Sequence, residues 1–330
     1  MGRRRKSSFY YTIAESYKVV SVKKWTYTIG LFLFSFFALL VMLFSSTMNQ
    51  YLSNELVDQK FGGCKVHKCL ANTSKLAIIL PFKKEDTPKL IDFLIGMSKV
   101  TKKPIQSEKV NFYLVHINKD RRERKETESQ NTESNSFFKQ VPEQVIHDLH
   151  QIFDEVNFIP SFPDVYSDDD LIKYLLENRP SFLNHICFFH LISFDFIFLK
   201  NDWIDKFLNI SLFSIDQSFW VKGGIDFGFY PFSVHEDIEI SMYSIYAAHS
   251  DCLRELFTYA DEIYPAWRIS RALTAFLRSS SHMALSHLLS PRIIPATYAV
   301  NMAGVETSRS DLREKFPDAY IAQGARIIDE

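Results

Sequence analysis

The 330-residue sequence has almost no net charge: 38 lysines and arginines stand against 39 aspartates and glutamates, which gives a formal charge of −1. Nucleic-acid-binding domains are usually basic along one face, so this balance argues against nucleic acid as a partner. The chain is also poor in cysteine, with four residues in all. The few cysteines limit both the metal sites and the cross-links that the chain can form.

Cys64 and Cys69 flank one histidine, His67, but the further spaced ligands of a zinc site do not follow. The even number of cysteines permits two disulfide bonds in an oxidising compartment, and a local Cys64–Cys69 loop is one option. Cys187 lies in an apolar stretch and fits a free buried thiol.

One long apolar run lies near the N-terminus. Residues 25–48 carry no charge, and about 20 apolar residues suffice to span a bilayer. Lysine and arginine dominate residues 1–24, which favours a cytosolic location for that end. A cleaved signal peptide is the alternative, but its apolar core is normally shorter, about 7–15 residues. We therefore expect a type II, single-pass protein with a cytosolic tail (1–24), an anchor (25–48) and a stem (49–73).

Two glycosylation sequons, at Asn72 and Asn209, agree with a lumenal body. A later apolar stretch, residues 188–199, is too short and too polar for a second span. We interpret it as a buried helix-to-strand passage.

Residues 74–250 show the pattern of an α/β domain. Apolar runs predict strands at 76–80, 110–117 and 156–160, and apolar residues at helical spacing predict helices at 86–100 and 144–153. The polar insertion at 118–137 predicts disorder, with a binding loop as the alternative. Residues 251–330 carry amphipathic segments that predict a helical C-terminal region.

The first strand ends in a feature suited to a ligand. Pro81 has no N–H and ends the ladder, and Lys83 and Lys84 follow at the carboxyl end, where open α/β sheets bind ligands. Lysines at that edge suit a phosphate. Three aspartates, Asp168 to Asp170, precede another helical pattern; they fit capping of that helix, with metal binding as the alternative.

Residues 76–97, LAIILPFKKEDTPKLIDFLIGM, form one block, and residues 178–184 with 194–197 form a second. The two blocks resemble the β-1,4-galactosyltransferase family, and most closely its branch that adds galactose to xylose on proteoglycans. The first block resembles the family's apolar strand, Pro-Phe-Arg and following helix. Residues 178–184, NRPSFLN, resemble a second family motif, and Phe194-Asp195-Phe196-Ile197 stands where the family has Tyr-Asp-Tyr-Ile. The resemblance implies a GT-A-like nucleotide-sugar-binding sheet with helices on both faces.

The resemblance also implies which residues contact the UDP-sugar. These are Pro81, Phe82, Lys83, Asn178, Arg179, Gly223 and Gly224. Arg179 has the alternative of a surface residue at a helix end. Asp237 or Glu236 corresponds to the family's general base; in the alternative, both belong to the first turn of a helix at 238–247.

The chain departs from the family at the metal site. The family places Asp-Val-Asp after Tyr-Asp-Tyr-Ile to hold Mn²⁺, whereas here Phe198-Leu199-Lys200 leads directly to Asn201-Asp202. Mn²⁺ is expected from the family, with no ligands identified in this sequence. A skipped Asp-x-Asp stretch in the genomic DNA beside Ile197 would identify a splicing or gene-model gap.

Three hypotheses follow. The first is a Golgi-membrane enzyme that transfers galactose from UDP-galactose, with inversion, to a glycan acceptor such as xylose. The second is an inactive lumenal glycoprotein that retains the fold and acts as a binding or scaffold protein. The third is a transferase of another family that uses Asp168 to Asp170 as metal ligands.

Overall fold

The computed structural model describes residues 29, 31–40, 61, 74–118, 141–213, 219–228, 237–265, 267–278, 292–302 and 305–328. The chain divides into two compact units, residues 1–56 and residues 57–330. In the first unit, residues 31–40 are helical, and most of their apolar side chains are exposed. Within the described ranges, no helix has the length and apolar character needed to cross a membrane. The tail and most of the expected anchor, stem and 118–137 insertion lie outside these ranges.

The predicted strand–helix–strand unit is present as β1 (Lys75–Phe82), α2 (Thr87–Val100) and β2 (Val110–His116), with a short 3₁₀ turn, η1 (Lys84–Asp86), after β1. β1 and β2 pair in parallel, from Leu76 opposite Val110 to Phe82 opposite His116. Every residue of β1 after Lys75 is buried. Both faces of the strand are covered, which explains why the run carries no charge.

Nine strands form the main sheet, in the order β3-β2-β1-β4-β7-β6-β8-β10-β5. The first four are parallel, and β7 runs antiparallel to both of its neighbours. The further strands are β3 (Glu155–Ile159), β4 (Ile186–Leu191), β5 (Phe196–Phe198), β6 (Val221–Gly228), β7 (Asp237–Ala247), β8 (Ile293–Asn301) and β10 (Ile321–Gln323). A separate pair contains β9 (Glu306–Thr307) and β11 (Arg326–Ile327).

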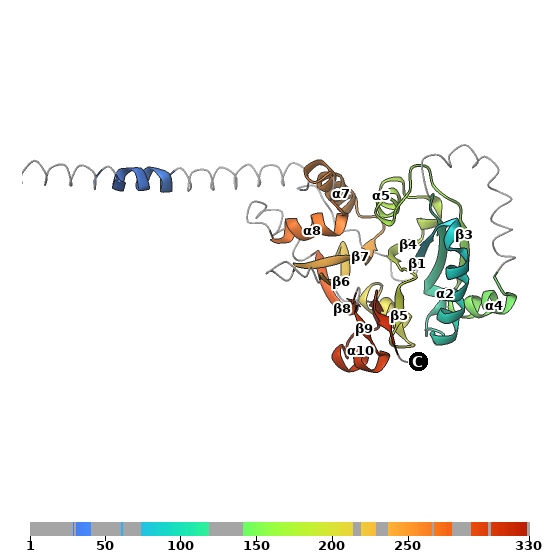
Figure 1. Cartoon of the computed structure of the whole chain (residues 1–330). Coiled ribbons are helices and arrows are strands. Elements are labelled where there is room, and N and C mark those ends of the chain that lie inside the picture. The colour runs from blue at the N-terminus through green and yellow to red at the C-terminus, as the bar shows by residue number, and fades with distance from the viewer. Residues whose placement is uncertain are drawn as a thin grey trace, which may run out of the picture. The chain divides into compact units, whose positions relative to one another are not determined.

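Helices cover both faces of the sheet, as expected (Figure 1). They are α4 (Glu143–Ile152), α5 (Asp168–Asn178), α6 (Trp203–Ile210), α7 (Asp251–Ile263), α8 (Ile269–Arg278) and α10 (Arg309–Lys315), with short turns η2 (Ser107–Lys109) and η5 (Ser181–Leu183). α2, α4 and α6 share a core with alternate residues of β1. On the other face α5 packs on α7, and the Tyr246 ring of β7 contacts Phe257 of α7.

The sequence predicted a helical C-terminal region, but the structure shows helices and strands there. α7, α8 and α10 are helical, whereas β8 joins the main sheet beside β6, and β10 pairs with β8. Residues 238–247 belong to a strand, β7, and not to a helix. Cross-strand pairing with β4 and β6 decides this, because propensity is a weak preference that tertiary contacts override.

Two further expectations were wrong. Residues 188–199 contain the second part of β4, a turn and β5, with no helical passage. Cys187 is not a free thiol: Cys187 and Cys252 are both disulfide-bonded. Cys64 and Cys69 lie outside the described residues.

Candidate functional site

The sheet has a topological switch point between β1 and β4. From β1 the chain adds β2 and β3 on one side, then returns to place β4 on the other side of β1. The two strands remain paired up to the carboxyl end of β4, where the Ile192 N–H donates to the Ile79 carbonyl at 2.9 Å, and β1 continues to Phe82. Ligands of open α/β sheets bind in the crevice outside such a point. Lys83 follows β1 there, and Ser193 and Asp195 follow β4.

Asp168 and Tyr243 meet beside these residues. The Tyr243 hydroxyl, on β7, donates a 2.8 Å hydrogen bond to Asp168 Oδ2, at the start of α5. Burial raises the pKa of Asp168, and the Tyr243 hydrogen bond and the Lys83 ammonium partly offset this shift. Burial also raises the pKa of Tyr243, to which the charges of Asp168 and Asp195 add. We call Lys83, Asp168, Ser193, Asp195 and Tyr243 the switch-point cluster.

The helix cap of α5 fixes the direction of Asp168. Ser167 is the N-cap, and its Oγ accepts the Asp170 N–H at 3.2 Å. The Asp170 carboxylate accepts from the Ser167 hydroxyl at 2.8 Å and from the Tyr166 N–H at 3.2 Å. Capping therefore occupies Asp170, while Asp168 points to Tyr243.

The three aspartates do not form one metal site. Asp168 and Asp170 have separate partners, and one buried oxygen of Asp169 has none. Burial raises the pKa of Asp169, and Arg268 is the main charge that opposes the shift. Among the side chains that the structure describes, no three His, Cys, Asp or Glu residues gather closely enough to hold a metal ion.

The resemblance places the Mn²⁺ carboxylates after Ile197, where β5 ends at Phe198 and Leu199-Lys200 follows without a carboxylate. The turn between β4 and β5 contains Ser193-Phe194-Asp195, in which the Ser193 Oγ accepts the Asp195 N–H at 3.3 Å. One exposed carboxylate and one hydroxyl, with the Lys83 ammonium close to Asp168, are a poor donor set for a divalent ion, which binds chiefly through carboxylates. The described residues do not fit Mn²⁺ at this position.

Of the predicted β1 residues, only Lys83 is available to a ligand. Pro81 and Phe82 are buried, and the Phe82 ring packs on His116 and Phe158 at centroid distances of 5.5 and 5.8 Å. Phe82 therefore packs in the core and stabilises the end of β1, and it is not exposed to a ligand. Lys83 is half-buried at the crevice.

Gly223 and Gly224 lie toward the same edge of the sheet as Lys83. Gly223 of β6 is opposite Ser244 of β7, one residue beyond the level of the His190–Ile245 pair. The register shifts between Gly223 and Ile225, so the pairing of β6 is irregular at the edge of the switch point.

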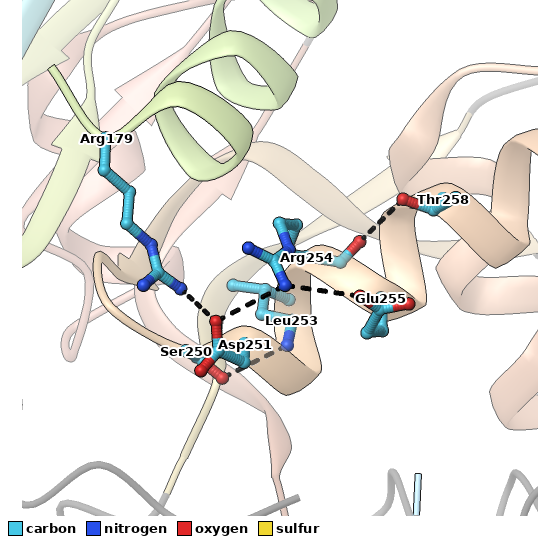
Figure 2. Close-up of polar contacts among 7 residues, drawn as sticks. All are labelled: Arg179, Ser250, Asp251, Leu253, Arg254, Glu255 and Thr258. Carbon is cyan, nitrogen blue, oxygen red and sulfur yellow. Dashed lines mark hydrogen bonds and ion pairs between the residues drawn. The ribbon is translucent and has the colours of Figure 1, made fainter. Parts of the chain in front are cut away.

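Asn178 and Arg179 lie at the opposite edge of the sheet. Arg179 caps the C-terminus of α5 with a left-handed backbone (φ 44°, ψ 62°), and its Nη2 donates to Asp251 Oδ1 at 2.6 Å (Figure 2). Asp251 begins α7, directly after β7 reaches the amino end of β4. The 11 residues of α5, about 16 Å of helix, separate Arg179 from Asp168. The structure thus does not bring Arg179 together with Lys83.

Asp237 is also remote from the cluster along its strand. It is the first residue of β7 and pairs with Gly228. Tyr243 lies six residues further along β7, which corresponds to about 20 Å of extended chain. Glu236 lies outside the described residues. The sequence patterns did not indicate Ser193 or Tyr243; the available signal for Ser193 was a Ser-x-Asp segment after a strand in which His190 is the one polar residue.

No family model matches the sequence, and none of the curated proteins matches it. Among solved structures, the chain is similar to galactosyltransferase LgtC in complex with donor and acceptor sugar analogues, with 9% identity, a TM-score of 0.35, and coverage of 75% of this chain and 86% of that chain. It is similar to apo mouse xyloside xylosyltransferase 1, with 10% identity, a TM-score of 0.36, and coverage of 76% and 97%. A third similar structure is a glycosyltransferase involved in glycosylation of the PBCV-1 major capsid, with 11% identity, a TM-score of 0.33, and coverage of 76% and 92%. All three are glycosyltransferases, but likenesses this remote do not assign an activity to the chain.

Proposed function

We propose that the protein is a glycosyltransferase that binds a UDP-sugar at the switch point of its sheet. The observation that carries the proposal is the convergence of Lys83, Asp168, Asp195 and Tyr243 beyond the carboxyl ends of β1 and β4. An ammonium group suits a diphosphate, and a buried carboxylate suits proton transfer. The resemblance of residues 76–97 to the β-1,4-galactosyltransferases supports UDP-galactose as donor and a sugar such as xylose as acceptor.

The proposed reaction is transfer with inversion. The acceptor hydroxyl oxygen forms a bond to the anomeric carbon, the bond from that carbon to the phosphate oxygen breaks, and UDP leaves. The hydroxyl proton passes to a carboxylate, and Asp168 takes this role in place of the remote Asp237. Its raised pKa suits a base, and the hydrogen bond from Tyr243 fixes the position of the carboxylate; general-base help is worth about 10²–10⁴ in rate.

We further propose that the described domain lies in the Golgi lumen behind a type II anchor. The apolar run at 25–48 and the basic tail support this topology. The disulfide-bonded Cys187 and Cys252 fit an oxidising compartment. Asn209 is exposed on α6, so its sequon is open to modification. Glycosidase treatment and protease protection of the full chain in cells test the topology: Asn209→Gln should remove one glycan, and an unmodified, protease-accessible domain would contradict the proposal.

Activity is tested with the full-length chain, UDP-galactose and a β-xyloside, with and without Mn²⁺. Asp168→Asn should lower transfer by about 100-fold or more, whereas Asp92→Asn, an exposed position on α2, should leave it unchanged. Neither transfer nor UDP binding by the wild-type chain would refute the proposal.

A second candidate is a lumenal protein that binds a UDP-sugar or a glycan without turnover. The poor metal donor set after β4 favours it. UDP binding without transfer to any tested acceptor would support this candidate over the enzyme.

A further inference from the structure

The switch-point cluster contains a lysine whose donors are not used. Lys83 is half-buried and acts on the charge of Asp168, yet no hydrogen bond or salt bridge joins its ammonium to any described residue. Other half-buried lysines are engaged: Lys75 pairs with Asp154, and Lys173 pairs with Asp261. An ammonium group whose N–H donors are unused can form charge-assisted hydrogen bonds with an anion.

Asp168, the carboxylate on which the Lys83 charge acts, is hydrogen-bonded to another group. Asp168 accepts the Tyr243 hydroxyl at 2.8 Å, and it begins a helix whose dipole favours negative charge. Lys83 therefore influences Asp168 through space while its own N–H donors stay available. The backbone of Lys83 is extended (φ −104°, ψ 156°) at the end of β1, so the side chain leaves the sheet at its carboxyl edge.

The same crevice disfavours a divalent cation. In the turn between β4 and β5, Asp195 is the one carboxylate, and it is exposed. The Lys83 ammonium acts on Asp168, the other carboxylate of the cluster, and would repel a divalent cation bound to it, because like charges repel strongly in a partly buried setting. A diphosphate needs compensation of its charge, and Lys83 is placed to supply it.

We propose that this protein binds a nucleoside diphosphate at the switch point without a divalent metal ion, with Lys83 as the main counter-charge. The inference rests on the proposed function and adds that Lys83, which stands where the family has arginine, compensates the diphosphate charge without a metal ion. It concerns binding only, so its test does not depend on turnover.

The test is calorimetric titration of UDP into the full-length chain in detergent, in excess EDTA and again with Mn²⁺. The dissociation constant should agree between the two conditions within about 3-fold, because the lysine, not the metal, carries the interaction. Lys83→Gln should weaken binding in EDTA by roughly 10- to 100-fold, the usual range for a lost hydrogen bond to a charged group. Lys83→Arg keeps the charge and should retain binding.

The matched control is Lys99→Gln, at the exposed far end of α2, which should leave the dissociation constant unchanged. UDP binding that needs Mn²⁺ would overturn the metal-free inference while leaving the proposed function in place. Metal-free binding that survives Lys83→Gln would overturn the role of Lys83. No UDP binding in either condition would overturn the proposed function itself.

Discussion

The His190→Phe substitution should remove the loss of folding stability that the buried His190 causes when the pH falls from 7.5 to 5. His190 lies in β4, fully buried, and its ring stacks on Phe207 with a centroid distance of 4.4 Å and an interplanar angle of 11°. Its Nδ1 lies 2.5 Å from the Leu191 carbonyl, so Nδ1 carries the hydrogen, because a carbonyl only accepts. The Nε2 atom is buried with no partner. Protonation would therefore bury a charge whose new N–H has no acceptor.

The size of the effect follows from the pKa of the buried ring. Burial lowers the pKa of His190 from 6.5 to about 3, against a smaller opposing effect of the Leu191 carbonyl. The unfolded chain thus takes up a proton below pH 6.5 that the folded chain refuses until about pH 3. Stability falls as pH falls through this window, by about 2 kcal/mol between pH 7.5 and pH 5. Because the pKa of His190 in the folded chain lies well below 5, the folded chain holds almost no proton on His190 at pH 5, and the uptake of a proton by the unfolded chain sets the size of the stability loss.

The assay is urea unfolding of the full chain at pH 7.5 and pH 5, followed by tryptophan fluorescence. The wild type should lose about 2 kcal/mol more than His190→Phe over this interval, because the other titrating groups are common to both proteins. Phenylalanine keeps the stacking, and the lost Nδ1 hydrogen bond should cost about 1 kcal/mol at both pH values. His150→Phe, exposed on α4, is the control and should follow the wild type. Equal pH dependence in the wild type and His190→Phe would refute the reasoning.

Three other outcomes test particular contacts. Ser167→Ala should lower the stability by about 1 kcal/mol, because the Asp170 N–H loses its cap; an unchanged urea midpoint would contradict the capping role. Cys252→Ser should cost about 2–5 kcal/mol through the lost disulfide, and a reducing agent should destabilise the wild type but have a smaller effect on the variant. Arg179→Gln should change stability by less than about 1 kcal/mol, because its partner Asp251 is exposed, and should leave UDP binding unchanged. Weaker UDP binding by the Arg179→Gln variant would show that Arg179 contributes to nucleotide binding and would contradict its assignment to the opposite edge of the sheet.

Local patterns were sufficient where a segment's own sequence decides its structure. β1 is an apolar run, and α2 repeats its buried residues as Leu90, Leu94 and Met97, so both elements could be predicted. The same is true of α4 and β3. β7 and β8 could not be predicted in this way, because each becomes a strand by pairing with segments distant in the sequence.

The residues of the candidate site also fall into two groups: those that the sequence indicated and those that only the tertiary structure revealed. Lys83 could be found from the sequence because it follows a recognisable strand end. Tyr243 could not be found, because 75 residues separate it from Asp168 and only the position of β7 beside β4 brings them together. Arg179 was misplaced for the same reason: its motif resembles a nucleotide-binding one, but the direction of α5 carries it to the opposite edge of the sheet.

The sequence by itself determined the apolar run near the N-terminus, the strand–helix–strand start of the domain and the lysines after β1, since each depends on neighbouring residues alone. The tertiary structure decided which carboxylates lie near Lys83 and Tyr243. It placed Asp168 near both of them and Asp195 near Tyr243, and it kept Asp237 at the far end of β7. The physical reason is that a crevice is assembled from the ends of several strands and a helix, and sheet order, which follows from long-range pairing, decides which ends meet.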